Sequence, residues 1–306
     1  DDYAIEERYD SYIKVYYGKQ SGFAGGGTNV YSTTQLSSNP SGYAFSLTDD
    51  SHGDGLKVGQ GGDVNGDGYS DIIIGSYALD TGGMSNNGGV YIILGRSNFS
   101  SGSYDLKTHS IVDASFLGEM PNDYLGGGSD NHEGTRIIGD INGDGYDDII
   151  LGSYTNDESG SDNGKSYLVL GRETGWTRDI NIGLKDLVWV DASFVSEGMS
   201  SSEYFGWSTS SGDLNGDGIL DLSFGAYRVR GGSGDSKYTG KVYIHYSDLL
   251  SDHPISKNIN ITNNLRGKLT FNWLSSYSDS GLSTWAFTSI LKTKLSSDTN
   301  IESNWT

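Results

Sequence analysis

Three short segments of the chain place acidic and amide side chains on alternate residues. Residues 62–75 read GDVNGDGYSDIIIG, residues 139–152 read GDINGDGYDDIILG, and residues 212–225 read GDLNGDGILDLSFG. Counted from the first aspartate, side-chain oxygens stand at positions 1, 3, 5 and 9, and position 7 can offer its backbone carbonyl. Calcium prefers several hard oxygen ligands, which alternate residues of a tight loop can direct at one centre. Each segment is therefore predicted to bind one calcium ion.

The predicted ligands repeat almost unchanged in the three loops. Three aspartates in each loop balance the charge of the ion, and glycines at positions 4 and 6 permit the backbone angles of a tight turn. The predicted ligands are Asp63, Asn65, Asp67, Tyr69 and Asp71 in the first loop; Asp140, Asn142, Asp144, Tyr146 and Asp148 in the second; and Asp213, Asn215, Asp217, Ile219 and Asp221 in the third. We expect three bound Ca2+ ions in total.

The spacing of the acids separates these loops from the EF-hand, which needs a bidentate glutamate at position 12. That position holds Ile74, Leu151 or Phe224 here, and the last acid leads directly into an apolar run. The loops are thus predicted to be hairpins between strands. The alternative is a metal-free hairpin turn rich in Asp, Asn and Gly. Turn geometry alone does not require an acid at position 9 in every copy, so the repetition favours calcium.

The loops belong to a longer repeat that predicts four strands. Short apolar runs closed by glycine follow each loop, and buried strands have this pattern. A second apolar segment follows at 90–94, 166–170 and 242–246, and residues 112–116 match residues 190–194. Four strands per repeat is the size of a propeller blade.

The predicted fold is an all-β propeller of four-stranded blades, formed by residues 1–306 as a single domain. The blades are expected at 41–98, 110–172 and 186–246, with a fourth made of 266–306 combined with 1–20, so that the termini share one blade. The alternative is a fragment of a larger propeller. The fourth repeat, near residue 288, has no carboxylates and is not expected to bind calcium.

Composition excludes several classes of function. The net charge is −20, from 40 acidic and 20 basic side chains, so no basic face is expected for nucleic acid. The chain has no cysteine, which excludes disulfides and thiolate metal sites. No apolar run is long enough to span a bilayer, so no direct membrane insertion is expected. No signal peptide is visible, so a secreted form would have lost it.

These motifs resemble the FG-GAP repeat of integrin alpha-subunit propellers and many bacterial surface proteins. The third repeat shows the likeness best, with Phe205-Gly206, the loop from Asp213, and Gly225-Ala226-Tyr227. Tyrosine replaces the proline of the motif in all three copies, at Tyr77, Tyr154 and Tyr227.

The resemblance implies that calcium has a structural role and holds each hairpin rigid. It also implies that partners bind the opposite face of the propeller. That face would carry the loops near 78–88, 155–163 and 228–239 and the connections near 97–109, 173–185 and 248–265.

The sequence offers no convincing catalytic set, and no catalytic residue is predicted. None of the five histidines belongs to a metal-binding pair, and His245 is expected to be a packed or edge residue of a strand. His132 and Glu133 adjoin a glycine-rich segment, which alone is weak support for a site. The tryptophans and tyrosines could stack on sugars, but packing between blades is the favoured interpretation.

The sequence therefore predicts a non-catalytic, calcium-stabilised module of an extracellular or cell-surface protein. A rigid face would present preformed loops to a protein or glycan ligand, as in adhesion. The alternatives are a lectin-like domain, a propeller-based polysaccharide lyase or hydrolase, and a structural spacer. A cleft with convergent His, Tyr and acidic groups would favour the enzyme.

Overall fold

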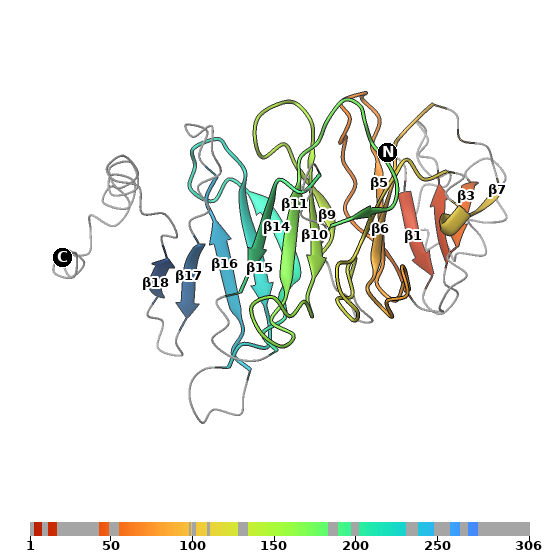
Figure 1. Cartoon of the computed structure of the whole chain (residues 1–306). Helices are drawn as coiled ribbons and strands as arrows, with labels where there is room; N and C mark the ends of the chain where they lie inside the picture. The colour runs from red at the N-terminus through yellow and green to blue at the C-terminus, as the bar shows by residue number, and fades with distance from the viewer. Residues whose placement is uncertain are drawn as a thin grey trace, which may run out of the picture.

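The computed structural model describes a chain of β-strands. The described residues are 3–7, 12–16, 43–48, 55–97, 99, 102–108, 111–127, 134–182, 189–196, 202–230, 238–247, 258–263 and 269–274. Within them the only helical element is a single 3-10 turn, η1 (Leu106–Thr108). The strands form four sheets, which follow one another across the molecule in chain order (Figure 1).

Three of the sheets each contain one predicted calcium loop. The first holds β4 (Leu56–Val58), β5 (Ile72–Ser76), β6 (Gly89–Ile93), β8 (Ala114–Leu117) and β12 (Ile180–Asn181). The second holds β9 (Arg136–Gly139), β10 (Asp148–Ser153), β11 (Lys165–Val169) and β13 (Ala192–Val195). The third holds β14 (Phe205–Gly212), β15 (Asp221–Ala226), β16 (Lys241–His245), β17 (Asn258–Asn263) and β18 (Leu269–Leu274). We call these the first, second and third repeat sheets.

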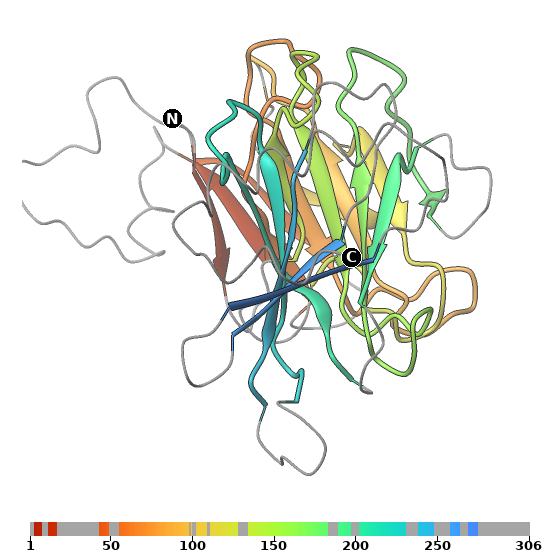
Figure 2. The same ribbon diagram turned by 90° about the vertical axis from the view of Figure 1, so that its left-hand side faces the viewer.

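The fourth sheet lies on the N-terminal side of the first repeat sheet. It consists of β1 (Tyr3–Glu7), β2 (Tyr12–Tyr16), β3 (Tyr43–Thr48) and β7 (Gly102–Asp105). Its strands are antiparallel except for the pair β3 and β7, and the first repeat sheet is antiparallel except for β8 and β12. Figure 2 shows the same stack after a quarter turn.

Side chains alternate between the two faces of each central strand, as the pleat of a β-strand requires. In β5, Ile73 packs into the cluster shared with the second repeat sheet, whereas Ile74 packs into the cluster shared with the N-terminal sheet. In β10, Ile149 and Leu151 face the first repeat sheet, and Ile150 faces the third. These strands are therefore buried on both faces, which explains why their sequences are continuously apolar.

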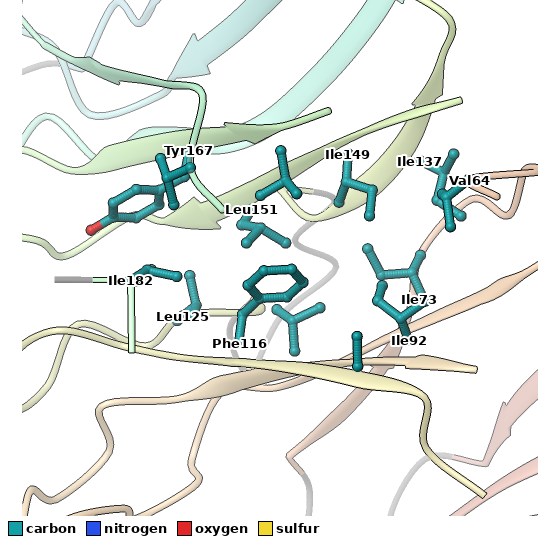
Figure 3. Close-up of a cluster of buried hydrophobic side chains, with 14 residues drawn as sticks. Val64, Ile73, Ile92, Phe116, Leu125, Ile137, Ile149, Leu151, Tyr167 and Ile182 are labelled. Atoms are coloured by element: carbon teal, nitrogen blue, oxygen red, sulfur yellow. The ribbon is translucent and has the colours of Figure 1, made fainter. Parts of the chain in front are cut away.

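Three hydrophobic clusters fill the three gaps between neighbouring sheets. The middle cluster, drawn in Figure 3, joins Ile73, Ile92 and Phe116 to Ile149 and Leu151. Each is completely or almost completely buried, and full burial of such a side chain contributes about 1.5–3 kcal/mol. Face-to-face packing of four sheets is thus the main source of stability.

Glycines mark the points at which the backbones of neighbouring sheets meet. Gly75, at the end of the apolar run of β5, has no room for a side chain because the backbone of Gly126 lies against it. Gly152 is the equivalent residue of β10, and its carbonyl accepts a hydrogen bond from the amide of Gly126 at 3.0 Å. The glycine that ends the apolar run of each of these strands therefore permits the backbones of neighbouring sheets to approach closely.

The predicted all-β class is confirmed, and the sheets pack face to face as propeller blades do. Two predicted groupings need correction. Strand β8 was predicted to belong to the blade at 110–172, but it pairs with β6 in the first repeat sheet. Strand β13 was predicted to belong to the blade at 186–246, but it pairs with β11 in the second repeat sheet. The similarity of residues 112–116 and 190–194 shows that these strands are equivalent, but it does not show which sheet each one joins.

The predicted fourth blade combined 266–306 with 1–20. In the described residues, β2 pairs with β1 and β3, and β18 pairs with β17. Residues 275–306 lie outside those that the structure describes. The number of blades and the closure of a ring remain predictions.

Candidate calcium centres

The first predicted loop is closed by its own side chains. Asp63 accepts hydrogen bonds from the backbone amides of Asp67, at 3.1 Å, and Gly68, at 2.8 Å. Asn65 Oδ1 accepts from the amide of Asp67 at 3.2 Å, and Asp67 Oδ1 accepts from the amide of Tyr69 at 2.9 Å. The side chains at positions 1, 3 and 5 therefore all turn back onto the same short stretch of backbone.

The second and third loops repeat this pattern. The amides of Gly145 and Gly218 donate to the first aspartate of their loops, Asp140 and Asp213, at 2.8 and 3.0 Å. The first of the two loop glycines has a φ of 71°, 77° or 79°, in the left-handed region that favours glycine. The predicted ligands at positions 1, 3 and 5 are thus gathered in the same way three times.

The aspartate at position 9 is buried and links the loop to its sheet. Asp71 accepts from the amide of Val64 through Oδ2 and from the amide of Gly95 through Oδ1, both at 2.7 Å. Asp148 accepts in the same way from Ile141, at 2.7 Å, and from Gly171, at 2.8 Å. The corresponding donors to Asp221 are the amides of Leu214 and Ser247.

Burial shifts the pKa of these position-9 carboxyls upward. It raises the pKa of Asp71 to about 6 and that of Asp148 to about 7, against the opposing effect of the amide donors. The negative charges at positions 1 and 5 of the same loop add to the rise. The pKa of Asp221 is raised for the same main reason. A cation placed among these acids would relieve their repulsion.

The donor set fits calcium in chemistry. Each loop offers three carboxylates, one amide oxygen and a backbone carbonyl, which are the oxygen ligands that calcium takes. Among the described residues, no three acidic or histidine side chains stand together as a ready-made metal cage. Asn65 Nδ2 instead donates to Asp67 Oδ2 at 2.9 Å, and the same bond recurs in the other two loops. Binding would require these side chains to exchange hydrogen bonds for the ion.

A row of aromatic side chains stands at the other end of the same strands. The loops precede β5, β10 and β15, whereas Tyr77, Tyr154 and Tyr227 directly follow these strands. Tyr124 and Tyr204 come from the connections that lead into β9 and β14. The loops near 78–88 and 155–163 begin beside these tyrosines, so those predicted binding loops lie at the aromatic end.

The aromatic row runs across three sheets with neighbouring ring centroids 4.1–6.1 Å apart. Tyr124 lies 6.1 Å from Tyr77 and stacks on Tyr154 at 6.0 Å. Trp207 continues the row, 5.0 Å from Tyr154 and 4.1 Å from Tyr227. We call Tyr77, Tyr124, Tyr154, Tyr204, Trp207 and Tyr227 the aromatic row. Sequence reasoning did not predict it, although the tyrosine in place of proline in each repeat was its signal.

Arg228 extends the aromatic row toward Tyr238. Its guanidinium lies 4.7 Å from the ring centroid of Tyr204 and 4.9 Å from that of Tyr238. It also donates to both phenolic oxygens at 2.8 Å. The hydrogen bond from Arg228 lowers the pKa of Tyr238. This end of the row therefore combines a fixed positive charge with exposed aromatic surface.

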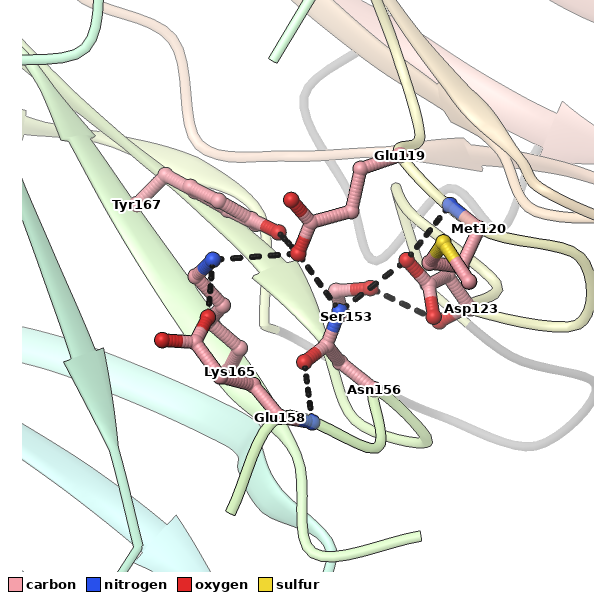
Figure 4. A network of polar contacts seen from close by, with 8 residues as sticks. All are labelled: Glu119, Met120, Asp123, Ser153, Asn156, Glu158, Lys165 and Tyr167. Carbon is pink, nitrogen blue, oxygen red and sulfur yellow. Dashed lines mark hydrogen bonds and ion pairs between the residues drawn. The ribbon is translucent and has the colours of Figure 1, made fainter. Parts of the chain in front are cut away.

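A polar network ties the connection before β9 to the second repeat sheet (Figure 4). Glu119 Oε1 accepts hydrogen bonds from Tyr167 at 2.7 Å, Asn156 at 2.8 Å and Lys165 at 3.0 Å. Lys165 also forms an ion pair with Glu158 at 2.5 Å. Burial would raise the pKa of Glu119, but the hydrogen bonds from Tyr167 and Lys165 outweigh it and the pKa is lowered.

Asp123 is the second acid of this network. Its carboxyl accepts from Asn156 at 3.0 Å and from the amide of Met120 at 3.1 Å. Burial raises its pKa to about 6, against the opposing hydrogen bond from Asn156. The network brings Tyr and acidic groups together, but Lys165, Tyr167 and Asp123 are all buried. Its bonds join residues 119–123 of the connection to the second repeat sheet.

Other predicted candidates have simpler surroundings. The ring of His245 packs 5.3 Å from that of Phe194, so it is a packed histidine as expected. Trp176 and Trp189 pack against the middle cluster, which agrees with packing between sheets. His132 and Glu133 lie outside the described residues. Of the helical residues that the structure describes, none forms a helix long and apolar enough to cross a membrane.

Comparison with known families finds a match in each of the three repeat sheets. The FG-GAP repeat family matches residues 58–93, 138–169 and 205–245. Each matched segment contains one predicted calcium loop and the two strands that follow it.

Curated relatives match part of the chain. Phosphatidylinositol-glycan-specific phospholipase D of Bos taurus is 33% identical over 124 residues, which is 40% of this chain and 14% of that protein. The Rattus norvegicus protein of the same name is also 33% identical over 124 residues. Integrin alpha-PS3 of Drosophila melanogaster is 28% identical over 169 residues, or 54% of this chain and 12% of that protein. The chain thus spans a small part of these relatives.

Proposed function

We propose, from the premise that this chain carries three FG-GAP repeats, that it is a calcium-stabilised binding module of an extracellular or cell-surface protein. Calcium would fill the three loops at one end of the strands, and a protein or glycan ligand would bind at the other end. The observation that carries the proposal is the aromatic row, which stands at the end of β5, β10 and β15 opposite to the loops.

The calcium part of the proposal rests on the repeated loop geometry. In each loop the first aspartate accepts hydrogen bonds from the amides at positions 5 and 6, and the buried aspartate at position 9 is held by two further amides. The ligand side chains of each loop are thus already gathered on one short stretch of backbone, and an ion would replace some of their hydrogen bonds. Sites of micromolar or weaker affinity would fill only where calcium is abundant, which favours an extracellular location.

The binding part rests on the chemistry of the aromatic row. Tyrosine, tryptophan and arginine are the side chains that most often dominate binding energy at interfaces. Here Tyr227 and Tyr238 are 43% and 45% exposed, and Arg228 is held between two rings. Because the rings brace one another, little side-chain freedom would be lost on binding. The FG-GAP match and the similarity to integrin alpha-PS3 support an adhesive role for this module.

The first test is calcium counting with thermal unfolding in calcium and in chelator. We expect three bound ions and a large stabilisation by calcium. The second test screens wild-type protein against glycan arrays and cell-surface proteins, with Trp207→Ala as the test variant. Leu214→Ala is a matched control, since Leu214 is an exposed apolar residue at the loop end. If Trp207→Ala and Leu214→Ala both lost binding, or if neither did, the ligand would not bind at the aromatic row.

The enzyme alternative, a polysaccharide lyase or hydrolase, has a defined test. Asp123, which precedes Tyr124 of the aromatic row, and Glu119 are engaged by neighbouring donors in the polar network. Cleavage of a polysaccharide that is abolished by Glu119→Gln would establish the enzyme and overturn the binding module.

A further inference from the structure

We propose that the first and second calcium loops bind their ions cooperatively through Asp147, while the third loop binds independently. The inference rests on the proposed function of the loops as calcium sites. It goes beyond that function because it assigns a role to a residue that is not a predicted ligand. Asp147 stands at position 8 of the second loop, between the predicted ligands Tyr146 and Asp148.

Asp147 forms two hydrogen bonds with Asp63, the first predicted ligand of the neighbouring loop. Its Oδ2 accepts a hydrogen bond from the backbone amide of Asp63 at 2.8 Å, across 84 residues of sequence. Its own amide donates to the carbonyl of Asp63 at 2.9 Å. The backbone of Asp63, which sets the direction of the first predicted ligand of loop one, is therefore fixed by the second loop.

A second path joins the buried aspartates at position 9 of the two loops. Asp148 Oδ1 accepts from the amide of Gly171 at 2.8 Å, and the next amide, that of Arg172, donates to the carbonyl of Val64 at 2.9 Å. The amide of Val64 donates in turn to Asp71 Oδ2 at 2.7 Å. A displacement of either carboxylate is therefore transmitted to the other through three hydrogen bonds.

Side-chain packing reinforces the connection. The ring of Tyr146 lies against Gly66 in the first loop, where a β-carbon would come within 2.8 Å of the ring. Tyr146 occupies position 7 and Gly66 occupies position 4 of their loops. Thus Tyr146 and Asp147 of the second loop contact the first loop directly, and Asp148 is linked to it through Gly171 and Arg172.

Among the described residues, the second and third loops show no bond like that of Asp147, because position 8 of the third loop is Leu220. A leucine side chain cannot accept a hydrogen bond, and Leu220 instead packs against Gly139 and the cluster between the two sheets. Position 7 of the third loop is Ile219, so no ring is available there. At positions 7 and 8, the third loop thus lacks the aromatic ring and the carboxylate that the second loop directs at the first.

Cooperativity follows from ordering that is shared between the two loops. An ion in the second loop would fix the residues on either side of Asp147, and Asp147 would then hold Asp63 in place. The ion in the first loop would bind a partly ordered site and lose less conformational entropy. Coupling of this kind is reciprocal, so each ion strengthens the binding of the other by the same factor.

The test is a titration of the whole chain with calcium, monitored by calorimetry, and a parallel titration with terbium, monitored by luminescence. Terbium replaces calcium and is excited through nearby tyrosine, which Tyr69 and Tyr146 supply in the first two loops and Tyr246 supplies beside Asp221 of the third. We expect two ions to bind together with a Hill slope above one and a third to bind separately. The variant Asp147→Leu, which copies position 8 of the third loop, should still bind three ions but lose the steep phase. Ser70→Ala, at position 8 of the first loop, is the matched control and should keep it.

A second variant keeps the test decisive if Asp147→Leu does not fold. Asp144→Ala removes a predicted ligand of the second loop and should weaken the first loop by roughly fivefold or more, with the third loop unchanged. Three ions that bind independently to wild-type protein would overturn the coupling and leave the calcium function standing. Absence of any bound calcium would overturn the calcium function, and the coupling with it. Equal weakening of the first and third loops would also refute the role of Asp147.

Discussion

The two ends of strands β5, β10 and β15 are built in different ways. At the loop end, the hydrogen bonds within each predicted calcium loop join residues two to seven positions apart, and a few longer-range bonds tie the loop to its surroundings. At the other end, the aromatic row is made of contacts between residues from different connections and different sheets. The loop end is therefore encoded mainly by local sequence, in three copies. The aromatic end exists only when the sheets have packed.

Calcium removal should show the largest difference between the two ends. A single ion at a thousand times its Kd stabilises the folded state by about 4 kcal/mol, and three sites add to this. We expect a chelator to lower the unfolding temperature strongly in wild-type protein and in Trp207→Ala alike. Differential scanning calorimetry in calcium and in chelator measures this, and a calcium effect that depends on Trp207 would contradict the separation of the two ends.

The pH dependence of stability should come next in size. The pKa of Asp123 is raised to about 6 from an ordinary value of 3.8, so the folded state favours its protonated form. The contribution of Asp123 to the free energy of unfolding is therefore complete below pH 3.8 and is lost as the pH rises through 6. The loss is at most about 3 kcal/mol. Asp123→Asn should flatten this fall. Urea unfolding of both proteins between pH 4 and 7 measures the difference.

Adding calcium to the same experiment should distinguish the pH dependence that arises at the loop end from the pH dependence that arises at Asp123. Asp71 and Asp148 also have raised pKa values without metal, so they too favour protonation in the folded state. Saturating calcium holds these carboxyls ionised and should remove their share of the pH dependence, while the share of Asp123 remains. If calcium abolished the difference between wild type and Asp123→Asn, the polar network would not be independent of the loops.

Truncation of the aromatic row should have a moderate effect. Trp207 contacts three rings of the row, and aromatic pairs contribute about 0.5–1.5 kcal/mol each beyond buried area. Trp207→Ala is expected to lose about 1–3 kcal/mol of stability without changing the number of bound calcium ions. Chemical denaturation with calcium counting gives both quantities, and Trp207→Phe should restore part of the loss.

The smallest effect is expected at Arg228. Its contacts with Tyr204 and Tyr238 are partly exposed, and such cation–π contacts contribute about 0.5–1 kcal/mol. Arg228→Lys keeps the charge but loses the paired hydrogen bonds to the two phenols, so it should cost less than 1 kcal/mol, an estimate on the order of one such contact. The pKa of Tyr238 should rise toward its ordinary value, which ultraviolet titration of tyrosine can measure. No change in that titration would show that the pairing is not formed in solution.

The sequence predicted the elements that depend on local patterns. The strands after each loop follow from apolar runs such as Ile72 to Ile74, and the inward turn of Asp63 follows from glycines at positions 4 and 6. The pairing of β8 with β6 was missed because residues 112–116 have the same pattern whichever sheet they join. The aromatic row was missed because Tyr124 and Tyr154 meet only through the packing of the first two repeat sheets.

The burial of β10 on both faces has a consequence for how the molecule opens. Ile149 and Leu151 belong to one cluster and Ile150 to the next, so the second repeat sheet cannot come loose unless two interfaces break together. The stack therefore behaves as a short one-dimensional array in which each sheet depends on its nearest neighbours. Amide hydrogens of β10, which is paired on both sides, should therefore exchange with solvent more slowly than those of β18, whose described partner is β17.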